Sequence, residues 1–198
     1  MKRAGLWIGL VVVGLVAIVL VNTFAGGYNA LTRGREEVKN QFAQVDNQLQ
    51  RRNDLIGSLV ETVKGTAIQE QEVFGKIAEA RAQMSGAHTA NEKIAAGQQM
   101  DGALGRLLVV IESYPQLKSN EAFLGLMDEI SGTENRLATE RMRYNEKVRD
   151  YNLLVKQFPS NIAASLFHFE PATYYEIPDS ARQAPKVDFG GLRNYGNK

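Results

Sequence analysis

The fold is decided by one long stretch with a repeating apolar pattern, YNALTRGREEVKNQFAQVDNQLQRRNDLIGSLVETVKGTAIQEQEVFGKIAEARAQM (residues 28–84). Apolar side chains recur at alternating steps of three and four residues, from Leu31 through Leu49 to Met84, and no proline interrupts them. This spacing is typical of a helix with a coiled-coil seam. The pattern therefore predicts a single helix of about 85 Å, because each helical residue rises about 1.5 Å.

An apolar segment precedes this helix. No charged residue lies between Arg3 and Arg33, and every side chain from Leu6 to Val21 is apolar or glycine. A helix needs about 20 residues to cross the hydrocarbon core of a membrane. Residues 4–25 are therefore predicted to contact the lipid bilayer as a single transmembrane helix.

The basic residues at the start of the chain bear on two further questions. Lys2 and Arg3 favour a cytoplasmic amino terminus, which places the soluble domain outside the cytoplasm; a cytoplasmic domain stays open. The same residues also fit a signal peptide, with residues 23–25 (TFA) as its cleavage site. Gly26 and Gly27 are expected to form a flexible joint that closes an anchor segment of residues 1–27.

Two further long helices follow residue 84. Thr89 and Glu92 form a capping box at the start of the second helix, and Pro115 follows its end. Its last part, residues 107–111 (LLVVI), is apolar on all sides, which predicts that this helix lies between its two neighbours. The third helix begins near Asn120 and carries an unbroken heptad seam over residues 123–158.

The chain is thus predicted to be all-α. A single N-terminal transmembrane helix precedes an antiparallel bundle of three long helices plus a short fourth over residues 162–169, and the bundle as a whole covers residues 28–176. Residues 177–198 are rich in glycine, proline, asparagine and charges, so a disordered tail is expected there.

Composition excludes several classes of function. The 198 residues contain no cysteine, which rules out disulfides, thiolate metal sites and cysteine nucleophiles. The net charge is +1 with acidic and basic residues interleaved, so nucleic acid is not an expected partner. His88 and His168 have no second histidine at metal-ligand spacing, and phosphate-loop and hydrolase motifs are missing. No metal, no cofactor and no enzymatic activity are expected.

Charges interrupt the two apolar seams at four positions, namely Arg52, Glu70, Glu134 and Arg141. A charge at a seam position must be paired or solvated, so ion pairs inside the bundle are the main prediction. In an up-down-up bundle with the first helix extending to residue 84, Glu134 lies about 30 Å from Arg52. These two residues are therefore not expected to meet. Recognition of a partner is the alternative role for the seam charges.

Two groups of residues are candidates for partner binding. The first is Arg51, Arg52 and Asp54. These residues would contact a second subunit, the membrane or another protein. The second is a repeated Tyr-Asn pair, one heptad apart, at Tyr144, Asn145, Tyr151 and Asn152. Here the expectation is packed tyrosines with solvated asparagines, and the alternative is a polar ladder that recognises a partner helix.

The aromatic residues Phe167, Phe169, Tyr174 and Tyr175 follow the third helix. They are expected to form a lid on the open end of the bundle, or else an exposed contact surface.

Three separated motifs identify a family. The segments QLQRRNDLIGSLVETVKG (residues 48–65), ESYPQLKSNEAF (112–123) and TENRLATERMRYNEKVRDYN (133–152), followed by Phe158 and Pro159, closely resemble the LemA family of bacterial membrane proteins. The resemblance covers residues 28–176 and implies a helical bundle behind a single membrane span, without assigned enzymatic activity or cofactor. The chain departs from the usual pattern at Asn53, where a bulkier histidine or tyrosine is common, and at Gly57 and Ser58, where proline and asparagine are frequent.

The function predicted from these observations is a membrane-anchored, non-enzymatic helical scaffold or interaction protein of the bacterial inner membrane. Membrane or envelope proteins are the expected partners, and a homo-oligomer is possible. The alternative is a secreted soluble helical protein whose signal peptide is removed.

Overall fold

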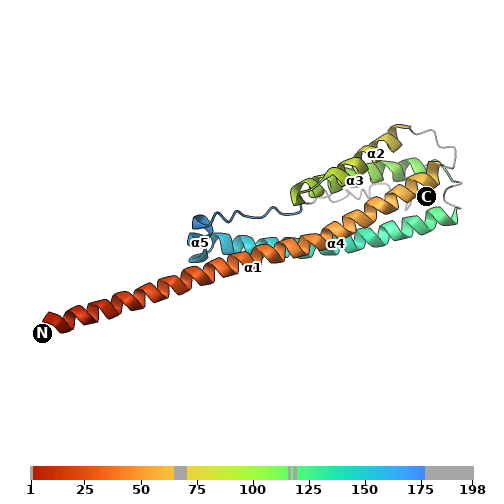
Figure 1. The fold of residues 1–198 in the computed structure, drawn as a ribbon. Helices are drawn as coiled ribbons and strands as arrows, with labels where there is room; N and C mark the ends of the chain where they lie inside the picture. The colour runs from red at the N-terminus through yellow and green to blue at the C-terminus, as the bar shows by residue number, and fades with distance from the viewer. Residues whose placement is uncertain (1, 65–70, 116, 118–119, 177–198) are drawn as a thin grey trace, which may run out of the picture.

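The computed structural model describes residues 2–64, 71–115, 117 and 120–176 (Figure 1). These residues form five helices and no strand, so the predicted all-α class is confirmed. The helices are α1 (Lys2–Lys64), α2 (Gln71–Gly86), α3 (Ala90–Glu112), α4 (Glu121–Lys156) and α5 (Ser160–Leu166). The tail expected at residues 177–198 and the seam charge Glu70 lie outside the described residues.

Helix α1 joins the apolar segment to the bundle without interruption. Its 63 residues run through Gly26 and Gly27, so the helix has no break at the position expected for a joint. The most apolar window of α1 has a mean hydropathy of 2.3, and none of that window is buried in the protein. By length and composition, α1 therefore contains one candidate membrane span, and Figure 1 shows this part projecting alone beyond the other helices.

The prediction of one helix over residues 28–84 is wrong. Helix α1 ends at Lys64, and α2 is a separate helix that pairs with α3. The apolar pattern did not reveal the break because α2 also needs one buried face, supplied by Ile77, Ala80 and Met84 at steps of three and four. A change of partner leaves such a pattern intact.

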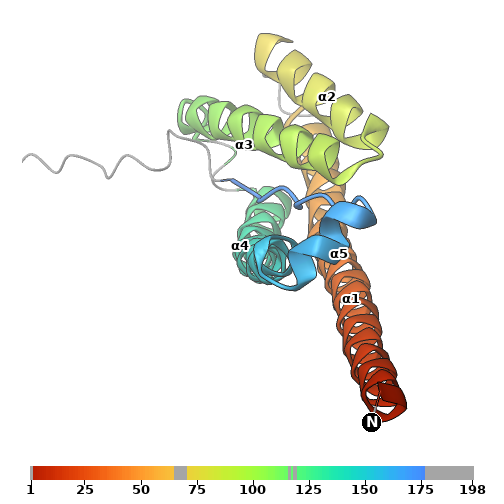
Figure 2. The ribbon, with the colours of Figure 1, turned by 90° about the vertical axis from the view of Figure 1, so that its left-hand side faces the viewer.

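Helices α1 and α4 form the longest contact of the bundle and run antiparallel (Figures 1 and 2). The rings of Phe42 and Tyr144 pack edge to face with centroids 5.4 Å apart. Ten residues further along α1, Arg52 contacts Glu134, which lies ten residues back along α4. Equal steps on the two helices show that the heptad seams of α1 and α4 keep one register.

Helices α2 and α3 form a hairpin that lies across the distal half of the α1–α4 pair (Figure 2). The prediction that residues 107–111 of α3 are covered on all sides is wrong. Leu107 is fully buried, but Val109 is 68% exposed and Leu108 is also exposed. The physical reason is that α4 covers the seam of α1 directly, which leaves α3 with only one face to bury.

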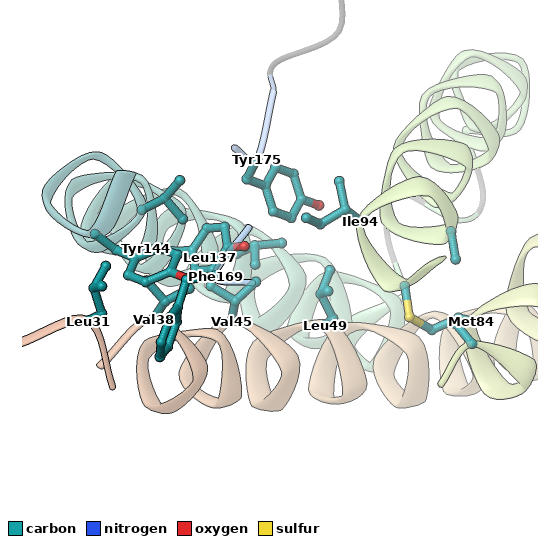
Figure 3. Close-up of a cluster of buried hydrophobic side chains, with 14 of the residues drawn as sticks. Leu31, Val38, Val45, Leu49, Met84, Ile94, Leu137, Tyr144, Phe169 and Tyr175 are labelled. Carbon is teal, nitrogen blue, oxygen red and sulfur yellow. The ribbon is translucent and has the colours of Figure 1, made fainter. Parts of the chain in front are cut away.

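The buried side chains form two clusters. One lies between the middle of α1, the C-terminal half of α4 and the chain that follows α5 (Figure 3). The other lies beneath the hairpin, around Ile56, Leu59, Met100 and Leu107. The predicted helix starts are confirmed: Thr89 and Glu92 form a capping box at α3, and the Asn120 side chain accepts a hydrogen bond from the Phe123 amide at α4.

Two glycines of α1 permit close approach of a neighbour. A Cβ built at Gly34 would lie 3.2 Å from the side chains of Tyr151 and Leu154. A Cβ at Gly57 would lie 2.5 Å from the guanidinium of Arg81, which reaches α1 from α2. These glycines therefore serve packing, while α1 itself continues straight through both positions.

Candidate functional site

A buried ion cluster joins three helices at the middle of the bundle. The side chain of Arg52 on α1 is fully buried, with 0% exposed. Its Nη1 donates to Glu134 Oε1 on α4 at 2.8 Å and to Asp101 Oδ1 on α3, and its Nη2 donates to the carbonyl oxygen of Gly97 at 2.9 Å. One guanidinium thus holds α1, α3 and α4 at the same level.

The cluster compensates the burial of its central charge. Burial alone lowers the pKa of Arg52, but the carboxylates of Asp101 and Glu134 outweigh that effect and raise it. A buried charge without such partners costs several kcal/mol, on the order of 3–5 when one partner of a buried pair is removed. The charged form of Arg52 therefore depends on Asp101 and Glu134 arriving from two other helices.

A second arginine extends the cluster towards solvent. Nη2 of Arg141 lies 3.6 Å from Asp101 Oδ2, and its guanidinium lies over the ring of Tyr175 at 4.4 Å. The predicted ion pairing of seam charges is therefore confirmed for Arg52, Glu134 and Arg141.

The prediction that Arg52 and Glu134 do not meet is wrong. It assumed a helix that continues to residue 84 before the chain turns back. In the structure α1 ends at Lys64 and α4 returns directly along α1, so the level of Glu134 coincides with that of Arg52.

An extended segment of the chain closes the cluster. Residues 169–176, here called the strap, run along α4 towards α3 without forming helix or strand (Figures 1 and 2). Tyr175 is buried, and a Cβ built at Gly97 would lie 2.7 Å from its hydroxyl oxygen. Figure 3 shows Tyr175 directed from the strap towards the side of Ile94 on α3.

The Tyr-Asn repeat of α4 binds the main chain of this strap. The Asn145 side chain donates to the Tyr175 carbonyl at 2.9 Å and accepts from the Tyr175 amide at 2.8 Å. Asn152 makes the same two bonds with Ala172, at 2.9 and 2.8 Å. Each asparagine therefore pairs with the N–H and the C=O of a single strap residue, as a residue on a neighbouring strand would.

The tyrosines of the repeat add two further bonds to the strap. The Tyr144 hydroxyl donates to the Thr173 carbonyl at 2.9 Å, and the Tyr151 hydroxyl donates to the Glu170 carbonyl at 3.0 Å. Neither bond involves a strap side chain, so the repeat recognises the main chain.

The spacing of the repeat explains why a helix can hold an extended chain. Seven residues of helix rise about 10.5 Å, and three residues of extended chain cover about 10 Å. The step from Asn145 to Asn152 on α4 thus matches the step from Tyr175 back to Ala172 on the strap. A Tyr-Asn pair repeated every heptad presents its amide groups at the interval that an antiparallel extended chain requires.

These contacts decide between the two readings of the repeat. The prediction that the tyrosines pack at seam positions is confirmed, because Tyr144 and Tyr151 are buried. The prediction that the asparagines are solvated is wrong, since Asn145 and Asn152 bind the strap. The repeat is a polar ladder, but the segment that it binds is an extended part of the same chain. The heptad repetition was the signal in the sequence that could have indicated this partner.

The aromatic residues after α5 divide into two pairs. Phe169 and Tyr175 are buried, and the Arg35 guanidinium lies 4.9 Å from the centre of the Phe169 ring. Phe167 and Tyr174 are exposed. The burial expected of a lid therefore holds for Phe169 and Tyr175, and the exposure expected of a contact surface holds for Phe167 and Tyr174.

Arg51 and Asp54 lie on the surface of α1, apart from the buried cluster. Arg51 lies 3.5 Å from Glu129 with its side chain 56% exposed, and Asp54 accepts a hydrogen bond from Gln50 at 3.0 Å. Of the predicted partner-binding residues, these two are the ones that the structure leaves accessible as charged groups. Within the described ranges, no three carboxylate or histidine side chains converge as metal ligands would.

The fold and the site define a class of protein: an all-helical bundle, braced by a buried ion cluster, on a long helix with one candidate membrane span. The match to the family model for the LemA family covers residues 41–189, most of the chain. The chain belongs to the LemA family.

Two magnetosome proteins are distant relatives of the chain. Magnetosome protein MamQ 2 of Paramagnetospirillum magneticum is 25% identical over 194 residues, covering 84% of this chain and 71% of the relative. Magnetosome protein MamQ of Magnetospirillum gryphiswaldense is 23% identical over 201 residues, covering 88% of this chain and 74% of the relative.

The first prediction concerns the amide ladder. Asn145→Asp and Asn152→Asp replace a donor by an oxygen that faces a carbonyl, so each should weaken the strap by about 1–3 kcal/mol. Hydrogen exchange of the Tyr175 and Ala172 amides should accelerate while the helical circular dichroism is kept. Asn135→Asp, on the exposed side of α4, is the matched control. Unchanged exchange in both ladder variants would contradict the assignment.

The second prediction compares two glycines of α3. Gly102→Ala should stabilise the protein by up to about 1 kcal/mol, because no atom lies within 4 Å of a Cβ there and alanine favours helix. Gly97→Ala should instead destabilise it by about 1–3 kcal/mol, because the Cβ would press against Tyr175 and Leu49. Urea unfolding of the full chain in detergent measures both. Equal effects at the two positions would show that Tyr175 does not pack on Gly97.

The third prediction concerns alkaline pH. Burial raises the pKa of Tyr144, Tyr151 and Tyr175, so the unfolded chain loses these protons first. The free energy of unfolding should therefore fall as pH rises above about 10, the ordinary tyrosine pKa, until the folded values are passed. Tyr175→Phe removes one of the three groups and should make the fall shallower. An identical pH profile in that variant would be inconsistent with a buried Tyr175.

Proposed function

We propose that this protein is a non-enzymatic, membrane-anchored scaffold of the bacterial inner membrane, which holds a helical hairpin at a set distance from the bilayer. The observation that carries the proposal is the continuity of α1 from the candidate span into the bundle. From Gly27 to Lys64 this helix rises about 55 Å. The α2–α3 hairpin lies on the distal half of that length (Figure 1).

The many contacts that hold the helices together support a role in which the protein keeps the hairpin in a fixed position. Helix α4 braces α1 in one register, and Arg52 ties α1, α3 and α4 together. The strap then fastens residues 169–176 to α4. A bundle fixed by such contacts can transmit the position of its anchor to its far end.

Packing at the base supports a retained anchor. Phe24 packs against the core cluster between α1 and α4, and a Cβ at Gly27 would lie 3.5 Å from Ala163 of α5. Cleavage after residue 25 would remove Phe24 from this contact. The basic residues Lys2 and Arg3 favour an amino terminus in the cytoplasm, so the bundle is proposed to stand on the extracytoplasmic side.

The charged groups of the cluster support a role without catalysis. The side chains of Arg52, Asp101 and Glu134 are bonded to one another across three helices, and Arg141 is engaged with Asp101 and Tyr175. The magnetosome proteins to which the chain is similar are likewise named for the magnetosome and not for a reaction. The arrangement therefore favours a structural role, in which the cluster holds the helices together, over a catalytic role in acid–base chemistry.

Partner proteins of the membrane or envelope, or a second copy of this chain, would meet the exposed groups of the distal half. These are Arg51 and Asp54 on α1 and the apolar pair Leu108 and Val109 on α3. Val109 is the more exposed of the two apolar side chains. Its contact with water is unfavourable, and a partner that covered it would remove this contact.

The fourth prediction tests these surfaces. A photoreactive residue in place of Arg51 or Val109 should crosslink this protein to another protein in native membranes. The same residue in place of Phe123, which is buried in the cluster beneath the hairpin, should give no such product. Mass spectrometry of the products identifies the partner. Equal yields at the buried and exposed positions, or none at either exposed one, would contradict the scaffold proposal.

A further inference from the structure

The membrane-proximal end of the bundle carries an apolar surface that its fold does not bury. Four large side chains there are exposed, with Phe158 at 78%, Leu166 at 62%, Phe167 at 49% and Ile162 at 44%. We call these four residues the base patch. Ile162 and Leu166 lie one turn apart on α5, and Phe158 precedes Ile162 by the same interval.

The segment that carries the base patch is also free of charge. From residue 157 to residue 167 the sequence is QFPSNIAASLF, whereas charged residues make up 23% of the whole chain. Exposed positions elsewhere on the bundle carry Lys, Arg, Asp and Glu in quantity. An uncharged and exposed apolar stretch in such a protein marks a contact surface.

The position of α5 along α1 indicates what that surface contacts. A Cβ at Gly27 would lie 3.5 Å from Ala163 and 3.6 Å from Ser160, and the rings of Tyr28 and Phe167 meet edge to face at 4.9 Å. Tyr28 lies three residues past the end of the predicted span at residue 25, a rise of about 4.5 Å. The headgroup layer on each side of a bilayer is about 5–7 Å thick. Helix α5 therefore lies at the level of the headgroups.

The base patch is continuous with the span itself. A groove of about 460 Å³ is lined by Val21, Phe24 and Tyr28 from α1 and by Leu166 and Phe167 from α5 and its end. One wall of this groove is thus formed by residues that end the span, next to exposed apolar side chains such as Val13 and Val19. Acyl chains that surround the span would reach the groove without meeting a charged side chain.

Two basic residues lie where they suit a bilayer surface, while the exposed acidic residue Glu170 follows Phe167 by three residues. Lys156 is exposed at the end of α4, and Arg33 is exposed on α1 as the first charged residue after the span. Aromatic rings with a polar tip, such as Tyr28, favour the boundary between headgroups and acyl chains. Basic residues just above an apolar surface favour phosphate groups.

From this geometry we propose that the base patch is a second membrane contact, in which α5 and Phe158 insert into the boundary between headgroups and acyl chains beside the span. The bundle then stands on two supports, the span of α1 and the base patch. Two supports fix the tilt of the bundle relative to the bilayer, which a single helix through the membrane does not. The proposal extends the scaffold function and rests on the same membrane insertion of residues 4–25.

The chain contains no cysteine, so single labels can be placed without altering other positions. Leu166→Cys and Phe158→Cys would each carry an environment-sensitive fluorophore in the full chain, reconstituted into vesicles of phosphatidylethanolamine and phosphatidylglycerol. Val109→Cys is the matched control, since it is equally exposed but lies at the distal end. Lipids with a nitroxide near the headgroup and aqueous iodide are the two quenchers.

Labels at 166 and 158 should be quenched several-fold more by the nitroxide lipids than the label at 109, and less by iodide. Adding Leu166→Glu should expose the label at 158 to iodide while the helical circular dichroism stays the same. If the labels at 166 and 109 respond alike to both quenchers, the proposal is overturned. Protection of the base patch from both quenchers would also overturn it, because a protein such as a second copy would then cover the surface.

A label at Val13→Cys separates this inference from the anchor. Protection from iodide at 13 together with access of iodide at 166 would remove the second membrane contact and leave the span in place. Access of iodide to both positions would remove the membrane anchor and, with it, the proposed scaffold function.

Discussion

One buried charge organises the bundle. The guanidinium of Arg52 has no contact with solvent, so its charge and its donors must be met inside the protein. Asp101, Glu134 and the carbonyl of Gly97 meet the charge and the two Nη groups from α3 and α4, while the buried Nε has no hydrogen-bond partner among the described residues. Apolar seams alone allow helices to slide by a turn at small cost, whereas this cluster is satisfied in only one register. The level of every other contact along α1 and α4 follows from it.

The strap depends on a second set of polar contacts, made by the side chains of α4. An extended segment that follows the last helix must satisfy its backbone amides and carbonyls, and a strand partner is missing from the described residues. The side chains of α4 supply that partner, because amides spaced one heptad apart match every third residue of an extended chain. The strap in turn brings Tyr175 over Gly97 and Arg141, so the ladder and the ion cluster stabilise each other.

The ion cluster and the strap both fix the other helices of the bundle relative to α1. A continuous α1 connects the candidate span with the ion cluster some 25 residues beyond Gly27, and α4 stiffens the part between them. The candidate span and the distal hairpin are therefore joined through packed helices. Membership of the LemA family fits this arrangement of a membrane-associated helical protein, in which the anchor and the bundle are one structural unit.

The sequence alone determined the apolar N-terminal segment, the all-α class, the capping box at Thr89 and Glu92, and the family. Tertiary structure decided where α1 stops, that α4 pairs with it, that Arg52 meets Glu134, and that the Tyr-Asn repeat holds the strap. The physical reason is that a periodic apolar face reports that a helix is covered on one side, but not which segment covers it. A buried charge or amide likewise demands a partner, and only the packed chain determines which residue arrives there.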